Sequence, residues 1–145
     1  MITSVVAGLV IGVILGSLGG GGAIQSDASV AVRNHSVLAG NSAANGGAIA
    51  THGPITVTDS AVNDNTSAAN GGALFADGAI EIRRSTVDGN GSGSHGGVAV
   101  AGTVVISGST FHDNQAQAGG VVQVSSSVTI ESSTFTANHA RATHG

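Results

Sequence analysis

The stretch GGAIATHGPITVTDSAVNDN at residues 46–65 decides the fold, because it returns 25 residues later as GGALFADGAIEIRRSTVDGN at residues 71–90. Both copies open on a Gly doublet and close on an Asn. The doublets recur at spacings of 25, 25, 25 and 23 residues, as Gly21-Gly22, Gly46-Gly47, Gly71-Gly72, Gly96-Gly97 and Gly119-Gly120. A fixed period of this length is the signature of a repeat architecture.

Three further sets of residues recur with nearly the same period as the doublets. We call each set, which occupies one position of the repeat, a column. The first is Asn41, Asn65, Asn90, Asn114 and Asn138. Five residues before each Asn stands Ser36, Ser60, Ser85, Ser109 or Ser133. Three residues before each Asn stands Leu38, Val62, Val87, Phe111 or Phe135. Four columns in phase indicate that each repeat has the same internal structure.

Within a repeat the apolar residues alternate with period 2, which predicts short strands. One strand follows the doublet (48–50), a second lies at 55–57, and a third brief extended piece precedes the Asn. Gly doublets exclude repeats made of helices. We therefore predict an all-β, right-handed, single-stranded parallel β-helix of about five coils of 23–25 residues, with three short strands per coil.

The composition agrees with a narrow interior. The chain has 24 Gly, three Phe and no Trp, Tyr or Cys, so large side chains cannot fill a wide core. The net charge is −4, with four Arg and no Lys, which argues against a nucleic-acid partner. The abundance of polar, uncharged residues favours a secreted location or one at the cell surface or outer membrane, and no cofactor is expected.

The recurring residues are expected to be structural. Gly47, Gly72, Gly97 and Gly120 should lie at corners where a Cβ atom would clash. The Asn column, and Ser60, Ser85, Ser109 and Ser133 of the Ser column, should bond from coil to coil, since coils lie about 4.8 Å apart. Residues 31–41 show a one-residue irregularity, which a bulge near Arg33–His35 would absorb.

Outward positions offer one candidate surface site. The first strand reads Gln25, Ala50, Phe75, Val100 and Gln123, with no acid or base. On the second strand, Glu81 and Arg83 are expected to form a surface pair. The third strand and its corner carry Asp64, Asp88, His112 and Asp113.

In that group Asp64 and Asp113 would lie two coils, or roughly 10 Å, apart, which suits neither Ca²⁺ nor a pair of glycosidase carboxylates. Solvated turn residues are the favoured interpretation. No catalytic residue and no metal ligand is expected.

The motifs GGAI (46–49), FHDN (111–114) and FTAN (135–138) resemble the GGAI and FxxN repeats of polymorphic outer membrane proteins. More broadly, residues 55–62 and 104–111 are similar to repeats of bacterial and viral right-handed β-helix proteins. The resemblance covers roughly residues 20–139. It implies a pectate-lyase-like β-helix and an exported, often adhesive, passenger region, although the chain is short for such proteins and shows no translocator barrel.

We divide the chain into an apolar segment at 1–19, β-helix repeats at 20–139 and a polar tail at 140–145. The apolar segment is open to three interpretations: a degenerate coil or cap, a signal-like or membrane-associated segment, or an artefact of an upstream start. After Asn138 no capping helix is visible, so an open edge could pair end to end with another copy. A fragment of a longer solenoid is the favoured alternative.

The expected function is a structural, adhesin-like surface module with a glycan or protein partner and no catalysis of its own. The alternative is a carbohydrate-active enzyme of the polysaccharide lyase or hydrolase type, or a fragment of one. Uniform coils of 23–25 residues favour the first, because they leave no long loops to wall a cleft.

Overall fold

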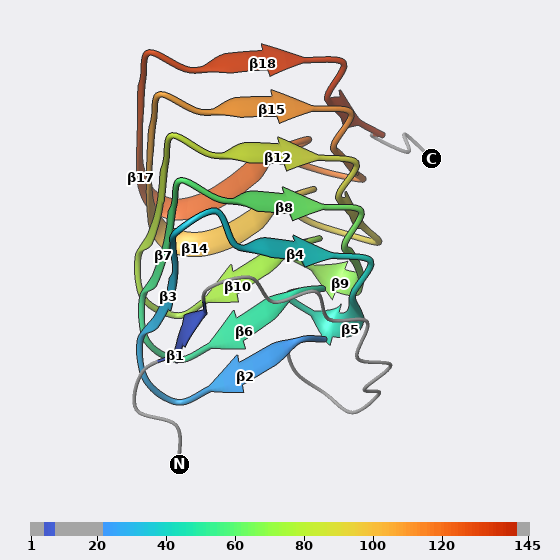
Figure 1. The fold of residues 1–145 in the computed structure, drawn as a ribbon. Coiled ribbons are helices and arrows are strands. Elements are labelled where there is room, and N and C mark those ends of the chain that lie inside the picture. The colour runs from blue at the N-terminus through green and yellow to red at the C-terminus, as the bar shows by residue number, and fades with distance from the viewer. Residues whose placement is uncertain (1–4, 8–21, 142–145) are drawn as a thin grey trace.

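The computed structural model describes residues 5–7 and 22–141, and every regular element in this part of the chain is a strand. The strands stack in parallel, each upon its counterpart one coil away (Figure 1). Two of the sheets hold five strands each, one from every coil. The predicted all-β solenoid of about five coils is therefore confirmed.

The largest sheet has nine strands and folds around one corner of the coil. Its first side contains β2 (Ile24–Ser26), β6 (Ile49–Thr51) and β10 (Leu74–Ala76). Its second side contains β1 (Val5–Ala7), β3 (Val30–Val32), β7 (Ile55–Thr58) and β11 (Ile80–Arg83). The long strands β14 (Ala99–Ser107) and β17 (Val122–Glu131) run through both sides.

One of the two five-stranded sheets carries the apolar residues that precede the Asn column. It contains β4 (Val37–Ala39), β8 (Ala61–Asn63), β12 (Thr86–Asp88), β15 (Thr110–His112) and β18 (Thr134–Thr136). Its register aligns Val62, Val87 and Phe111 across neighbouring strands. Phe111 stacks on Phe135, with ring centroids 4.8 Å apart.

The other five-stranded sheet follows the Asn column, where no strand was expected because only three strands per coil were predicted. It contains β5 (Ser42–Asn45), β9 (Thr66–Asn70), β13 (Gly91–Ser92), β16 (Gln115–Ala116) and β19 (His139–Ala140). Its strands are built from Ala and from polar residues or Gly, and they show no apolar alternation. Pairing with the neighbouring coil, and not local propensity, makes them extended.

The interior is a stack of small and branched side chains. Val, Ile, Leu and Ala columns from all three apolar strands fill it, and Phe111 is the one aromatic ring in the buried core cluster of the described residues. Ile49 and Leu74 share one column, and Ile55 and Ile80 share another. Burying each such side chain contributes roughly 1.5–3 kcal/mol.

The irregularity expected near Arg33–His35 is present in the structure, at the corner between β3 and β4. Val32 pairs with Val57 at an offset of 25 residues, whereas Val37 pairs with Ala61 at an offset of 24. Asn34 and His35 both adopt φ of 60°, which accommodates the extra residue in a left-handed turn.

Of the apolar segment at 1–19, only β1 belongs to the described residues, and it pairs in parallel with β3. The rest of that segment, and the tail beyond residue 141, lie outside them. The three interpretations of residues 1–19 therefore stay predictions.

Candidate functional site

The Asn column forms a hydrogen-bonded ladder through the interior. In each step, the backbone N–H and Nδ2 of one Asn both donate to Oδ1 of the Asn one coil further on. Between Asn65 and Asn90 both distances are 3.0 Å, and Nδ2 of Asn90 also donates to the Val62 carbonyl at 2.8 Å. Both Asn side chains are fully buried. The ladder thus satisfies polar groups that water does not reach.

The Ser column forms a second ladder at the preceding corner. The backbone N–H of Ser85 donates to Oγ of Ser109 at 3.1 Å, and Oγ of Ser85 donates to the Arg83 carbonyl at 2.7 Å. Ser109 and Ser133 repeat the step. Each hydroxyl therefore both caps its own turn and holds the adjacent coil.

The Gly doublets meet two different demands. The first Gly of a doublet adopts a left-handed conformation, as at Gly71 with φ of 60°. The second Gly has no room for a side chain, because a Cβ atom on Gly72 would lie 2.0 Å from the backbone oxygen of Gly97. The backbones of adjacent coils thus approach each other closely at this corner.

The surface group singled out in the sequence is only partly assembled. Nδ1 of His112 lies 2.9 Å from Oδ1 of Asp88, and both side chains are about half exposed. Asp64 and Asp113 sit at the adjoining corner with φ of 54° and 49°. Oδ1 of Asp64 lies over Gly89, where a Cβ atom would come within 2.4 Å of it. In the described part of the chain, no three His, Asp or Glu side chains converge so as to hold a metal ion.

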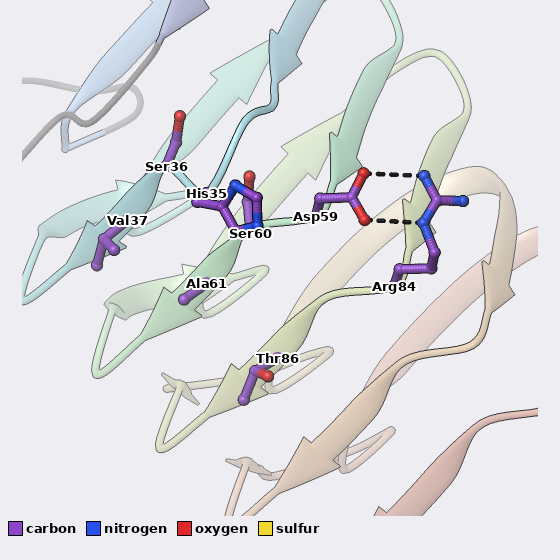
Figure 2. A pocket seen from close by; sticks show the side chains of 8 residues that line it. All are labelled: His35, Ser36, Val37, Asp59, Ser60, Ala61, Arg84 and Thr86. Carbon is purple, nitrogen blue, oxygen red and sulfur yellow. Dashed lines mark hydrogen bonds and ion pairs between the residues drawn. The ribbon is translucent and has the colours of Figure 1, made fainter.

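A second group, which the sequence reasoning missed, lies at the corner before the Ser column (Figure 2). Arg84 donates two hydrogen bonds to the carboxylate of Asp59, from Nε at 2.7 Å and from Nη2 at 2.9 Å. His35 occupies the corresponding position one coil earlier. These residues border an open hollow of about 280 Å³, with Ala61 between Val37 and Thr86 along its side.

The charges of this corner stabilise one another. The Arg84 guanidinium lowers the pKa of Asp59, chiefly through the hydrogen bond, and the electrostatic effect of His35 acts in the same direction. In turn, the Asp59 carboxylate raises the pKa of Arg84. Figure 2 shows the remaining guanidinium nitrogen of Arg84 pointing away from Asp59, where it can donate to a partner.

A third pair lies at the corner between the first and second sides of the large sheet. Nδ1 of His52 is 2.5 Å from Oδ2 of Asp77, and its Nε2 is 3.9 Å from Asp27 on the other side. The hydrogen bond to Asp77 raises the pKa of His52. His52 thus links three successive coils on the surface.

A third polar ladder, also missed, runs along the residues that directly precede the Gly doublets. Nδ2 of Asn70 donates to Oδ1 of Asn45 at 3.1 Å, and Nδ1 of His95 lies 3.0 Å from Oδ1 of Asn70. Both missed groups occupy fixed columns, one residue before the Ser column and one residue before the doublets. Aligning every column of the repeat, and not only the strand positions, would have revealed them.

Several acidic and basic side chains on the outer surface form pairs. Asp59 bonds Arg84, Asp88 bonds His112 and Asp77 bonds His52, each across one coil. The pair predicted on the second strand also forms, since Nε of Arg83 donates to Glu81 at 2.6 Å. The three pairs between coils help to hold neighbouring coils in register, whereas the Glu81–Arg83 pair lies within one strand.

Comparison with known proteins gives one match. A family model described as "Right handed beta helix region" matches residues 11–144, which is most of the chain. No curated protein and no solved structure matches. In the described residues, no helix is long and apolar enough to cross a bilayer.

Proposed function

Because the chain belongs to the family of right-handed β-helix regions, we propose that it is a rigid, adhesin-like structural module. It is secreted or held at a cell surface or outer membrane, and it presents its sides to a glycan or protein partner. It carries out no chemistry of its own. The resemblance to polymorphic outer membrane protein repeats supports the exported, adhesive role.

The observation that carries this proposal is that polar side chains bond neighbouring coils to one another. The buried Asn and Ser columns bond from coil to coil, and the charged groups Asp59 and Arg84 do the same on the surface. A scaffold needs these interactions to stay straight and stiff. What remains for a partner is a set of shallow surfaces, such as the hollow bordered by Arg84.

The test is direct binding of the folded chain. Fluorescently labelled protein is applied to a glycan panel and to whole bacterial and host cells. Saturable binding to at least one surface is expected, and heat-unfolded protein serves as the control. A folded chain that binds neither cells nor glycans contradicts the proposal.

The alternative, a carbohydrate-active enzyme, is favoured by the hydrogen bond between Asp88 and His112. A carboxylate and an imidazole in this arrangement can exchange a proton. The assay is release of unsaturated or reducing uronate from pectin-type polymers. Activity that is lost in Asp88→Ala but kept in Asp59→Ala would overturn the non-catalytic proposal.

End-to-end association is a further part of the proposal. Val128 and Ile130, in the last described coil, are 45% and 47% exposed, whereas their counterparts Val104 and Ile106 are fully buried. The same coil also presents the edge of β17. Apolar side chains beside unpaired backbone groups favour pairing with another strand edge.

A further inference from the structure

We propose that a hollow on the first side of the large sheet binds one neutral hexose unit of a glycan. This inference rests on the proposed binding function and names its ligand. The hollow lies over β2, β6 and β10, on the outer face, and has a volume of about 110 Å³. Ligand pockets usually measure roughly 300–1,000 Å³. The size therefore suits part of a single sugar ring, not an enclosed oligosaccharide.

The shape of the hollow follows from the size of three stacked side chains. Gln25, Ala50 and Phe75 occupy one outward column, in register on adjacent strands. The small side chain of Ala50 forms the floor, and the longer side chains on either side form the walls. Phe75 is partly exposed, so its ring gives the hollow an apolar wall. The C–H face of a pyranose ring can pack against such a wall.

The side toward β5 presents an oriented amide. Oδ1 of Asn45 accepts both the backbone N–H and Nδ2 of Asn70, at 3.3 and 3.1 Å. These bonds hold the Asn45 amide in one orientation. Its Nδ2 makes no hydrogen bond to the described residues, and Asn45 lines the hollow. A donor that is already oriented loses little entropy when it binds a hydroxyl oxygen.

The opposite side, after β6, presents groups that accept and donate. Asp27 and His52 both line the hollow. The carboxylate of Asp27 is highly exposed, and Nε2 of His52 is 3.9 Å from it. Asp77 engages the other ring nitrogen of His52 at 2.5 Å, which fixes the imidazole in place.

Together these groups select an uncharged, hydroxyl-rich ligand. Each sugar hydroxyl both donates and accepts, so it can meet the carboxylate of Asp27 and the amide of Asn45 at once. The carboxylate of Asp27, which lines the hollow, disfavours an acidic sugar, because like charges repel. A cationic side chain can meet Asp27 but offers no acceptor to Nδ2 of Asn45, whereas a hydroxyl can meet both groups.

The experiment is an NMR titration of the full, isotope-labelled chain with methyl glucoside, methyl galactoside and methyl mannoside. At least one of them should shift the side-chain amides of Asn45 and Gln25 and the backbone amides around Ala50. The expected dissociation constant is on the order of 1 mM or weaker, since one ring offers few contacts. Phe75→Leu, which keeps an apolar wall but removes the ring, should weaken binding roughly threefold to tenfold.

Two matched variants complete the test. Ala50→Val fills the hollow with a side chain that the same column already accepts at Val100, and it should abolish the shifts. Val100→Ala lies on the far side of Phe75, outside the lining, and should leave binding unchanged. Heteronuclear spectra confirm that each variant is folded.

The proposal is overturned if no neutral hexoside shifts these residues, if Ala50→Val binds as well as the unchanged chain, or if glucuronate or an arginine-rich peptide shifts them instead. The outcome is separable from that of the proposed function. Hexoside binding without cell attachment would contradict the adhesive role but not the hexose site. Cell attachment that is unchanged in Ala50→Val would contradict the hexose site but not the adhesive role.

Discussion

Left-handed backbone conformations recur at fixed corners of the coil. Some of these corners hold Gly, which adopts the conformation readily, and others hold residues with a side chain. One corner carries Asp64, Gly89 and Asp113, with φ between 49° and 62°. Another carries Asp59, Arg84 and Gly108, with φ between 45° and 58°. A residue with a side chain costs roughly 1–2 kcal/mol in this conformation. Surrounding coil-to-coil bonds hold Asp59 and Arg84 there.

Gly72 and Gly91 make a matched pair of substitutions. A Cβ atom on Gly72 would lie 2.0 Å from a backbone oxygen, whereas one on Gly91 would meet only side-chain carbons, at 3.7 and 3.8 Å. Gly72→Ala should therefore lower the free energy of unfolding by about 3 kcal/mol or more, and Gly91→Ala should change it by less than about 1 kcal/mol. Urea denaturation measures both. Equal losses would contradict the close approach at the doublets.

His52 should show a pH-dependent effect. Its pKa is raised above the ordinary 6.5 by Asp77, so the folded chain binds the imidazole proton more tightly than the unfolded chain. The stabilisation is fully present below pH 6.5 and is lost as the pH rises through the raised pKa. An NMR titration of the imidazole measures this pKa. In Asp77→Asn it should fall back toward 6.5, and a pKa that does not move would refute the assigned cause.

At the scale of the element, strand length depends on the neighbouring coil as much as on sequence. Three residues separate β10 from β11, and they form a corner. The next coil has two residues at the same place, Gly102 and Thr103, and there a single long strand, β14, runs through. The coil after that has three residues there, Ser125 to Ser127, and its strand β17 is also continuous, so the number of residues at this corner does not by itself decide whether the strand is interrupted.

The Asn ladder should contribute to stability through each of its buried side chains. Asn90→Leu removes the acceptor for two donors on Asn65 and a donor to Asn114. The expected loss in the free energy of unfolding is about 1–3 kcal/mol, because the orphaned groups are buried. Asn138→Leu, at the edge of the described stack, should cost less. Thermal and urea denaturation compare the two, and equal costs would show that burial does not set the penalty.

The whole molecule is a stack in which each coil covers its neighbour. Val104 and Ile106 are buried by the coil above them, but Val128 and Ile130 are nearly half exposed. Nearest-neighbour burial of this kind is characteristic of solenoids.

For the 145-residue polypeptide, we predict concentration-dependent association through this exposed coil. Sedimentation velocity should show dimers or larger species that the double variant Val128→Ser, Ile130→Lys abolishes. Thr56→Lys, a change on the side of the stack, is the control and should not alter association. If the unchanged polypeptide is monomeric at all concentrations, the end-to-end proposal fails.

The repeat alone determined the parallel stack, the inward columns and the corners, because identical residues at a constant period must meet their own copies one coil away. Asn65 and Asn90 illustrate this: a spacing of 25 residues sufficed to predict that they lie together.

Only the tertiary structure decided which unlike residues pair. Asp59 with Arg84, Asn70 with His95, and Asn45 with the hollow over Ala50 depend on the exact direction of side chains at corners. A period specifies the position of each residue in the coil. The backbone conformation at a corner and the size of the neighbouring side chains set where a side chain points and what it reaches.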